Sequence, residues 1–261
     1  MAVRNRRALY LHAKEPVRVV DAWPALMVFQ ASQAPRLIPL TRISRIVASG
    51  EIEWDQEALI ACMRADIPII LVDSKHFIVG WLTPAQRREG PLARSLIESG
   101  QRGSWRNALD SWQAAEERQG ILALLRCLKR PPYREDLRPE SFWPRALALL
   151  DRDWSGTTRR DVQVLQPFLF SLLSRMLLDA GAPKESVAAG RKHGIMMRFW
   201  NILRWDLLIL IHRLHLDPGH RWSGRDAAAC FESNSEFFVR RIEDLIEELE
   251  QVIDYVERVL P

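Results

Sequence analysis

Residues 39–50 read Pro39-Leu-Thr-Arg-Ile-Ser-Arg-Ile-Val-Ala-Ser-Gly50, and a second stretch reads Ile67-Pro-Ile-Ile-Leu-Val-Asp73. The first predicts a half-buried strand over 43–49 that stops at the glycine. The second is a continuous apolar run, which is typical of a strand buried on both faces. Between them, residues 57–64 predict a short helix, and residues 77–82 predict a further strand. This part of the chain therefore predicts a compact β-rich unit with one helix inserted.

The residues before this stretch continue the β pattern. Short runs of apolar or β-branched residues occupy 9–11, 18–20, 25–30 and 36–40, and they are separated by Pro16, Pro24 and Pro35. We therefore predict a β-rich N-terminal domain over residues 1–85.

Beyond residue 85 the apolar period changes to that of helices. We predict a linker over 86–103 and an all-helical C-terminal domain over 104–261, and the fold class is α+β. The predicted helices are 92–99, 104–129, 142–152, 161–180, 184–192, 197–216 and 236–259.

Composition excludes several classes of protein. With 261 residues, 48% of them hydrophobic and 27% charged, the chain has an ordinary globular composition and is long enough to bury a core. Its three cysteines are far apart and cannot form a disulfide framework, so a cytoplasmic location is predicted. The longest purely apolar run of the C-terminal third, 207–211, is too short to cross a membrane.

Charge is distributed unevenly along the chain. Residues 86–225 carry 24 Lys and Arg against 15 Asp and Glu, whereas residues 226–261 carry 3 against 10. Most of the positive residues in the middle are arginines, whose planar guanidinium binds phosphate through two parallel hydrogen bonds. A basic block of this size favours a polyanionic partner such as DNA or RNA, and a solvated, salt-bridged surface is the plainer alternative.

The N-terminal stretch resembles a known family. The run over 39–52, the helix start Glu57-Ala-Leu59, the strand over 65–73 and Val79-Gly-Trp-Leu82 are similar to the β-domain of the CRISPR adaptation integrase (the Cas-one, or Cas1, family). The resemblance implies an antiviral-defence enzyme, a DNA endonuclease and integrase that inserts spacer DNA into a CRISPR repeat array. It also implies a homodimer formed by the N-terminal domains and a partner, the small adaptation protein Cas-two (Cas2).

The resemblance continues into the helical half. Arg138-Pro-Glu140 is similar to the start of the family's Glu-bearing helix, Ala189-Gly-Arg-Lys-His193 to its Gly-x-x-His loop, and Leu203-Arg-Trp-Asp206 to its acidic element. These matches imply that Glu140, His193 and Asp206 ligate Mg²⁺ or Mn²⁺ and are the catalytic residues. Oxygen ligands with one imidazole suit either cation, which would activate a DNA 3′ hydroxyl and steady the leaving oxygen.

Basic residues adjoin these elements in the sequence. We predict that they hold DNA backbone phosphates, which position the nucleic acid without reading its bases. They are Arg159, Arg160, Arg191, Lys192 and Arg198.

Two departures leave alternatives open. Ser141 follows Glu140 where the family usually has glycine, and the fourth position of the acidic element is Ile209. Either Asp206 is the third ligand or that ligand has been lost at Ile209, and a decayed family member would act as a DNA-binding structural component. A basic helical scaffold for RNA or another protein is a further alternative. So is a zinc site at His212, His215 and His220, for which the sequence offers no convincing fourth ligand.

Overall fold

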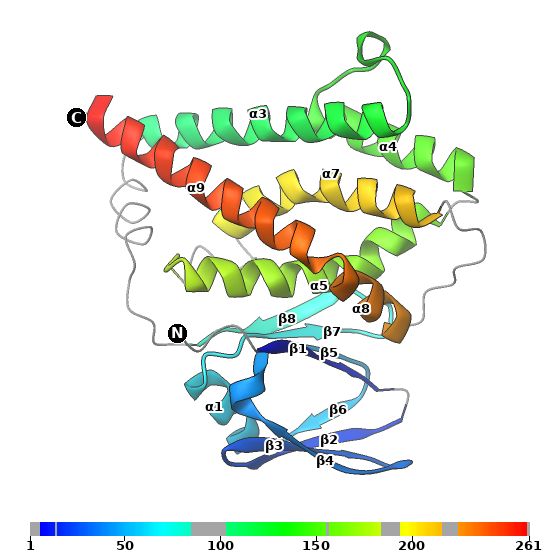
Figure 1. Ribbon diagram of the computed structural model, residues 1–261, viewed down its shortest axis with the longest axis vertical. Helices are drawn as coiled ribbons and strands as arrows, with labels where there is room; N and C mark the ends of the chain where they lie inside the picture. Colours follow the sequence, from blue (N-terminus) through cyan, green and yellow to red (C-terminus); the bar gives the residue numbers. More distant parts are fainter. Residues whose placement is uncertain are drawn as a thin grey trace.

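The computed structural model describes residues 6–13, 15–84, 103–154, 157–183, 194–215 and 224–259. A β-rich half forms one end of the molecule and a helical half the other, which confirms the predicted α+β class (Figure 1). The predicted linker falls almost wholly outside the described residues, as do the predicted helices 92–99 and 184–192.

Eight described strands form two four-stranded sheets. They are β1 Arg7–His12, β2 Val17–Ala22, β3 Ala25–Gln30, β4 Gln33–Pro39, β5 Ile43–Ser49, β6 Ile52–Trp54, β7 Ile69–Val72 and β8 Ile78–Leu82. One sheet has the order β1-β5-β7-β8 and the other β4-β3-β2-β6. Strands β5 and β7 are parallel, so a crossover must connect them, and helix α1 (Gln56–Arg64) lies within it.

The two central strands of the sheet of β1, β5, β7 and β8 are buried on both faces. Successive side chains of a strand point to opposite faces. On β5, Ile46 belongs to the apolar cluster of the β-rich half, whereas its neighbour Val47 belongs to the cluster of the helical half. On β7, Ile69 and Ile70 divide in the same way. This double burial is why β7 reads as an unbroken apolar run in the sequence, whereas β5, which was predicted to be half-buried, carries Ser44 and Arg45 and is nevertheless covered on both faces.

Six longer helices make up the described helical half. They are α3 Gly103–Cys127, α4 Pro139–Trp154, α5 Thr158–Asp179, α7 Ile195–His215, α8 Gly224–Ser233 and α9 Ser235–Val259. Helix α5 lies against β5 and β7, and α7 packs between α5 and α3 (Figure 1). In the described part of the chain, no helix is both long and apolar enough to cross a membrane.

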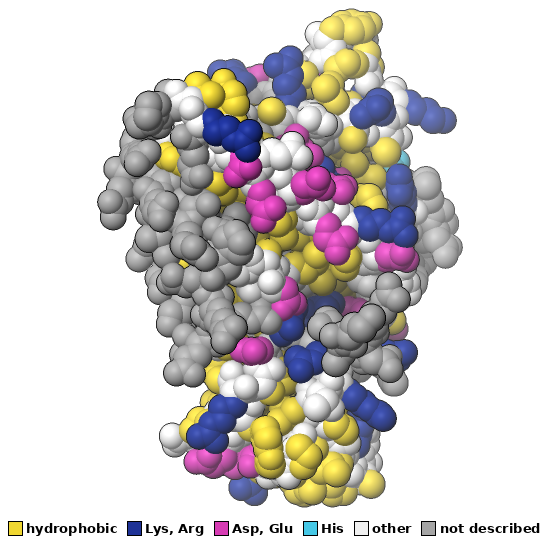
Figure 2. All heavy atoms as spheres, turned by 60° about the vertical axis from the view of Figure 1, so that its left-hand side comes forward, with side chains coloured by type: hydrophobic (Ala, Val, Ile, Leu, Met, Phe, Trp, Pro, Cys, Tyr) yellow, Lys and Arg dark blue, Asp and Glu magenta, His cyan; other side chains and the backbone are white. Residues whose placement is uncertain are grey.

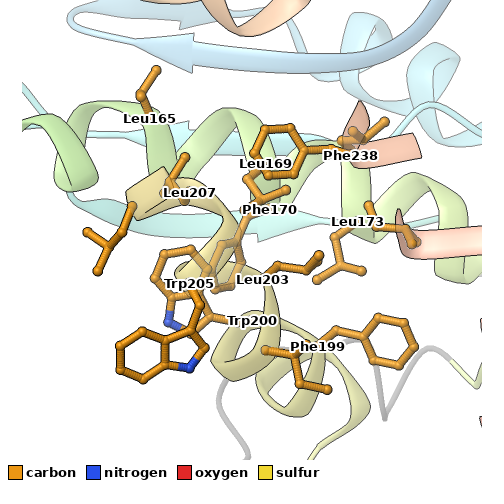
Figure 3. Packing of buried hydrophobic residues seen from close by; sticks show 14 of the residues in the cluster. Leu165, Leu169, Phe170, Leu173, Phe199, Trp200, Leu203, Trp205, Leu207 and Phe238 are labelled. Carbon is orange, nitrogen blue, oxygen red and sulfur yellow. The ribbon is translucent and has the colours of Figure 1, made fainter. Parts of the chain in front are cut away.

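The contact of α5 with α7 forms the centre of the helical core. Leu169 and Phe170 of α5 lie beside Trp200 and Leu203 of α7, and Phe238 of α9 closes one side (Figure 3). Phe170 and Trp200 have ring centroids 5.1 Å apart. Two further aromatic residues of α7, Phe199 and Trp205, are fully buried.

Helix α3 lies directly against Trp205 of α7 at Gly120. A Cβ atom at this position would lie 2.8 Å from Cβ of Trp205, closer than carbon atoms can pack. The absence of a side chain at residue 120 therefore sets how closely the two helices can pack.

Candidate functional site

Glu140 lies in the first turn of α4, directly after Pro139. Proline suits the first helical position, and an acid there complements the helix dipole. The side chain is exposed, and it lies within electrostatic reach of Arg138 and of Arg204 on α7. Glu140 is thus accessible from solvent at the open end of its helix.

Asp206 lies in the middle of α7, and its side chain is only 14% exposed. Burial raises the pKa of this carboxyl to about 6, although the nearby Arg241 lowers it and Glu116 raises it further. Oδ2 of Asp206 lies 3.7 Å from Nε of Arg241 on α9. The carboxylate therefore faces a cation supplied by the chain itself.

Arg241 contacts two further acids besides Asp206. Its Nη2 donates to Oε2 of Glu116 on α3 at 2.6 Å, and its Nη1 lies 4.0 Å from Oε1 of Glu248. Nε1 of Trp112 donates to the other oxygen of Glu248 at 3.4 Å. We call Glu116, Asp206, Arg241 and Glu248 the Arg241 cluster.

A further ion pair joins α3 and α7 directly. Nη2 of Arg204 donates to Oε2 of Glu117 at 3.0 Å, and its guanidinium carbon lies 4.7 Å from the ring centre of Trp143. Both adjacent acids of α3, Glu116 and Glu117, are therefore paired with arginines.

The structure describes two of the three predicted metal ligands, Glu140 and Asp206. His193 lies outside the described residues, as do Arg191 and Lys192. Within the described ranges, no three His, Cys, Asp or Glu side chains gather as metal ligands would. Ile209 is 7% exposed and packs in the helical core, so this position offers no ligand. The described residues alone do not form a site for a divalent cation, and the three-residue set remains a prediction.

The histidines of the zinc alternative are also only partly described. His212 is half-buried on α7, whereas the side chain of His215 and all of His220 lie outside the described part. That alternative therefore remains open as well.

The predicted phosphate-binding residues differ in exposure. Arg159 and Arg160 are exposed in the first turn of α5. Arg198 is buried, and its guanidinium pairs with Asp110 at 2.7 Å and donates to Gln113 at 3.1 Å. Through these contacts Arg198 connects α7 to α3, and its side chain does not face solvent.

A turn of the β-rich half adds residues that the sequence did not single out. Oδ1 of Asp73 accepts from the backbone N–H groups of Lys75 and Phe77, each at 2.8 Å, and fixes the turn between β7 and β8. Nε2 of Gln163 on α5 donates to the carbonyl of Lys75. Burial lowers the pKa of His76, and the charges of His12 and Arg160 lower it further.

This turn therefore lies beside the first part of α5, where Arg160 is within electrostatic reach of His76 and Arg159 is the adjacent exposed arginine. We call Lys75, His76, Arg159 and Arg160 the α5 basic patch. The residue types of the turn carried no signal, because only tertiary contact brings two stretches so far apart in the sequence together.

Comparison with known proteins matches part of the chain to a family and the whole chain to a known fold. Residues 15–138 match the family described as CRISPR associated protein Cas1. Among solved structures, a Cas1 protein from Thermotoga maritima has a TM-score of 0.70 at 13% identity, covering 95% of this chain and 97% of the other. No match was found among curated proteins.

Two further solved structures share the fold. The TtCas1–DNA complex has a TM-score of 0.63 at 12% identity, covering 95% of this chain and 91% of the other. A casposase bound to integration product has a TM-score of 0.59 at 11% identity, covering 87% and 82%. The match over residues 15–138 and the shared fold agree: this part of the chain matches the Cas1 family, and the fold as a whole is that of solved Cas1 structures.

Proposed function

We propose that this chain is a DNA integrase of CRISPR adaptation, which joins spacer-precursor DNA to a CRISPR repeat. The observation that carries the proposal is the Cas1 family match over residues 15–138, within a fold shared along nearly the whole chain. The likeness to a casposase bound to integration product supports the same reaction class. Such a reaction transfers a phosphodiester from one DNA 3′ oxygen to another.

The α5 basic patch is the part of the described surface that we propose contacts DNA. Arg159 and Arg160 are exposed, and Lys75 lies at the surface of the adjoining turn. Arginine forks suit phosphate oxygens, and such contacts position the duplex without reading its sequence. Arg191 and Lys192 belong to the same proposal on sequence grounds alone, whereas the buried Arg198 serves helix packing.

For the chemical step, we propose that Glu140 and His193 ligate Mg²⁺ or Mn²⁺, as the family resemblance implies. The exposure of Glu140 supports its part. Asp206 was predicted as the third ligand, but its pairing with Arg241 does not support that role.

A second candidate function is favoured by two observations. Ile209 offers no oxygen, and Asp206 faces Arg241. Both fit a family member that binds DNA as a structural component of adaptation without performing the joining step.

Partners are proposed on the same basis. We propose a homodimer formed by the β-rich halves and an assembly with Cas2. Exposed apolar side chains gather at the base of the β-rich half, as Figure 2 shows, and Trp23 and Leu37 are 66% and 61% exposed.

The joining assay separates the two candidate functions. Purified protein, with and without Cas2, is incubated with a labelled duplex bearing 3′ hydroxyls, a repeat-containing DNA, and Mg²⁺ or Mn²⁺. We expect a joined product that Glu140→Gln abolishes while duplex binding persists. Binding without joining under every condition would reject the integrase and favour the structural candidate.

The α5 basic patch is tested through the salt dependence of DNA binding. Each lost phosphate contact lowers the slope of log K against log salt by about 0.9. The double variant Arg159→Gln/Arg160→Gln should therefore flatten that slope by about 2 and weaken binding to all sequences alike. Arg18→Gln/Arg36→Gln, two exposed arginines of the other sheet, is the matched control and should bind as the unmodified chain does.

A further inference from the structure

The guanidinium of Arg241 is enclosed by three carboxylates from three helices. Its Nη2 faces Glu116 of α3 at 2.6 Å, its Nε faces Asp206 of α7 at 3.7 Å, and its Nη1 faces Glu248 of α9 at 4.0 Å. Each nitrogen thus has its own carboxylate. The arginine side chain is 22% exposed, and those of Asp206 and Glu116 are 14% and 7% exposed.

Buried carboxylates need a positive partner. Leaving an ionised carboxylate in an apolar interior without a counter-charge costs several kcal/mol. A divalent cation could supply that charge, and so could an arginine. In this chain Arg241 supplies the positive charge. Burial alone would lower the pKa of Arg241, but the contacts with Glu116, Asp206 and Glu248 raise it above its ordinary value, so the guanidinium stays charged.

The size of the guanidinium decides between the two partners. A Mg²⁺ ion gathers its oxygens at about 2.0–2.1 Å and holds them in a tight octahedron. Here the carboxylates are spread around a planar group, at 2.6 to 4.0 Å from three different nitrogen atoms. They cannot close on an ion while the guanidinium lies between them.

Two of the three carboxylates, those of Glu116 and Glu248, also accept a hydrogen bond from a neighbouring side chain. Glu116 accepts a second hydrogen bond through Oε1, from Nε2 of Gln119 at 2.9 Å. Glu248 accepts from Nε1 of Trp112 at 3.4 Å. These bonds hold the carboxylates in place around the arginine.

We propose that Arg241 takes the place of a divalent cation in the helical half, so that Asp206 is a structural acid and not a metal ligand. This inference rests on the proposed function, because it decides which of the predicted ligands can serve it. Any cation used in joining DNA is then held without Asp206, and the α3–α7–α9 contact is stable without metal.

The first experiment measures Mn²⁺ binding by calorimetry for the full chain, Asp206→Asn and Glu140→Gln. Removing a true ligand or its immediate support weakens metal binding by about 10- to 100-fold. We expect Asp206→Asn to bind Mn²⁺ within about threefold of the unmodified chain. A loss of tenfold or more that is specific to Asp206→Asn would overturn the inference.

The two proposals fail in different ways. If the unmodified chain and Asp206→Asn both bind no Mn²⁺, the metal-dependent integrase fails, and the assignment of Asp206 as a structural acid stands. If Glu140→Gln alone loses Mn²⁺ binding, both proposals are supported.

The second experiment removes the guanidinium. Arg241→Met leaves three carboxylates facing one another, and we expect its Tm to fall by roughly 5–10 °C. Millimolar Mn²⁺ should restore part of that loss, whereas the same concentration should raise the Tm of the unmodified chain less. Arg240→Met, in the adjacent and largely exposed arginine that pairs with Glu236, is the control and should show neither effect.

Arg241→Lys extends the test in case Arg241→Met does not fold. A lysine keeps one positive charge in the cluster, so we expect partial recovery of Tm and no additional response to Mn²⁺. If Arg241→Met is as stable as the unmodified chain, or if Mn²⁺ stabilises neither Arg241 variant more than the unmodified chain although both are destabilised, the arginine does not stand in for a cation.

Discussion

Arg45 on β5 donates a hydrogen bond from Nη2 to Oε1 of Glu232 on α8, at a distance of 2.6 Å. The arginine side chain is 7% exposed, and its Nε also donates to Oγ of Ser171 on α5 at 3.1 Å. The hydroxyl of Tyr10 on β1 donates to the same oxygen of Glu232. These contacts tie the β-rich half to two helices, so we expect both halves to unfold together.

Replacing Arg45 with methionine tests this connection. The change leaves Glu232 without its cation and Ser171 without a donor. Breaking a fully buried pair costs about 3–5 kcal/mol, and because Glu232 is 38% exposed we expect about 2 kcal/mol, measured by urea denaturation. Arg18→Met is the matched control, since its pair with Glu53 is exposed and should contribute under about 0.5 kcal/mol. Equal losses in the two variants would contradict the prediction.

Gly120→Ala should destabilise the chain, although alanine is the better helix former. Helix propensity alone would give a gain of about 0.5–1 kcal/mol. The new Cβ would instead meet Cβ of Trp205 at 2.8 Å, and overpacking of this kind costs about 1–3 kcal/mol. We therefore expect a net fall in Tm by scanning calorimetry. An unchanged or raised Tm would show that α3 can move away from α7 freely.

Cys62 should be nearly inert in the folded chain. It is fully buried, and burial raises the pKa of its thiol from 9.0 to about 12, with a further contribution from Asp21. Because only the thiolate reacts, three pKa units lower the reactive fraction about a thousandfold near neutral pH.

Iodoacetamide labelling followed by mass spectrometry measures this effect, with the partly exposed Cys127 and Cys230 as internal comparisons. In the folded chain the labelling rate of Cys62 should keep rising with pH beyond 9, whereas in urea it should level off there. Rapid labelling of native Cys62 at pH 8 would disagree with its burial.

Leu37→Lys should weaken the proposed homodimer. Leu37 lies on β4, an edge strand of its sheet, and is 61% exposed. A lysine at a buried interface would desolvate a charge, and charged residues on an edge strand oppose pairing. Light scattering after size exclusion should show a shift from dimer toward monomer at equal concentration. Val79→Lys on β8, equally exposed, is the control and should leave the mass unchanged.

Some elements were predictable because local pattern and tertiary role coincide. The strands β3 and β5 have the bounds predicted, and α9 begins one residue early. Strand β6 was expected between the Gly50 turn and the helix, but its three residues, Ile52-Glu-Trp54, are too few for alternation to fix its bounds. Helix α8 was missed because its apolar residues cluster in a short alanine-rich run, and its helical state depends on packing against α5 and β1.

The site was predictable only in part. The sequence identified Glu140 and Asp206 as candidate metal ligands, and Glu140 is exposed to solvent, as that prediction requires. It gave no indication that Asp206 faces Arg241, because the two residues lie on different helices. Arg198 was grouped with exposed arginines by its neighbours in the chain, yet its position on α7 turns it toward Asp110.

The sequence by itself determined the α+β class, the two-sided burial of β7, and the resemblance to the Cas1 family, because these features follow from short-range pattern and residue order. Only the tertiary structure decided which charges neutralise one another, because helices pack by shape and bring together side chains that no local rule relates. The same physics placed His76 within electrostatic reach of Arg160, and Arg241 among three carboxylates.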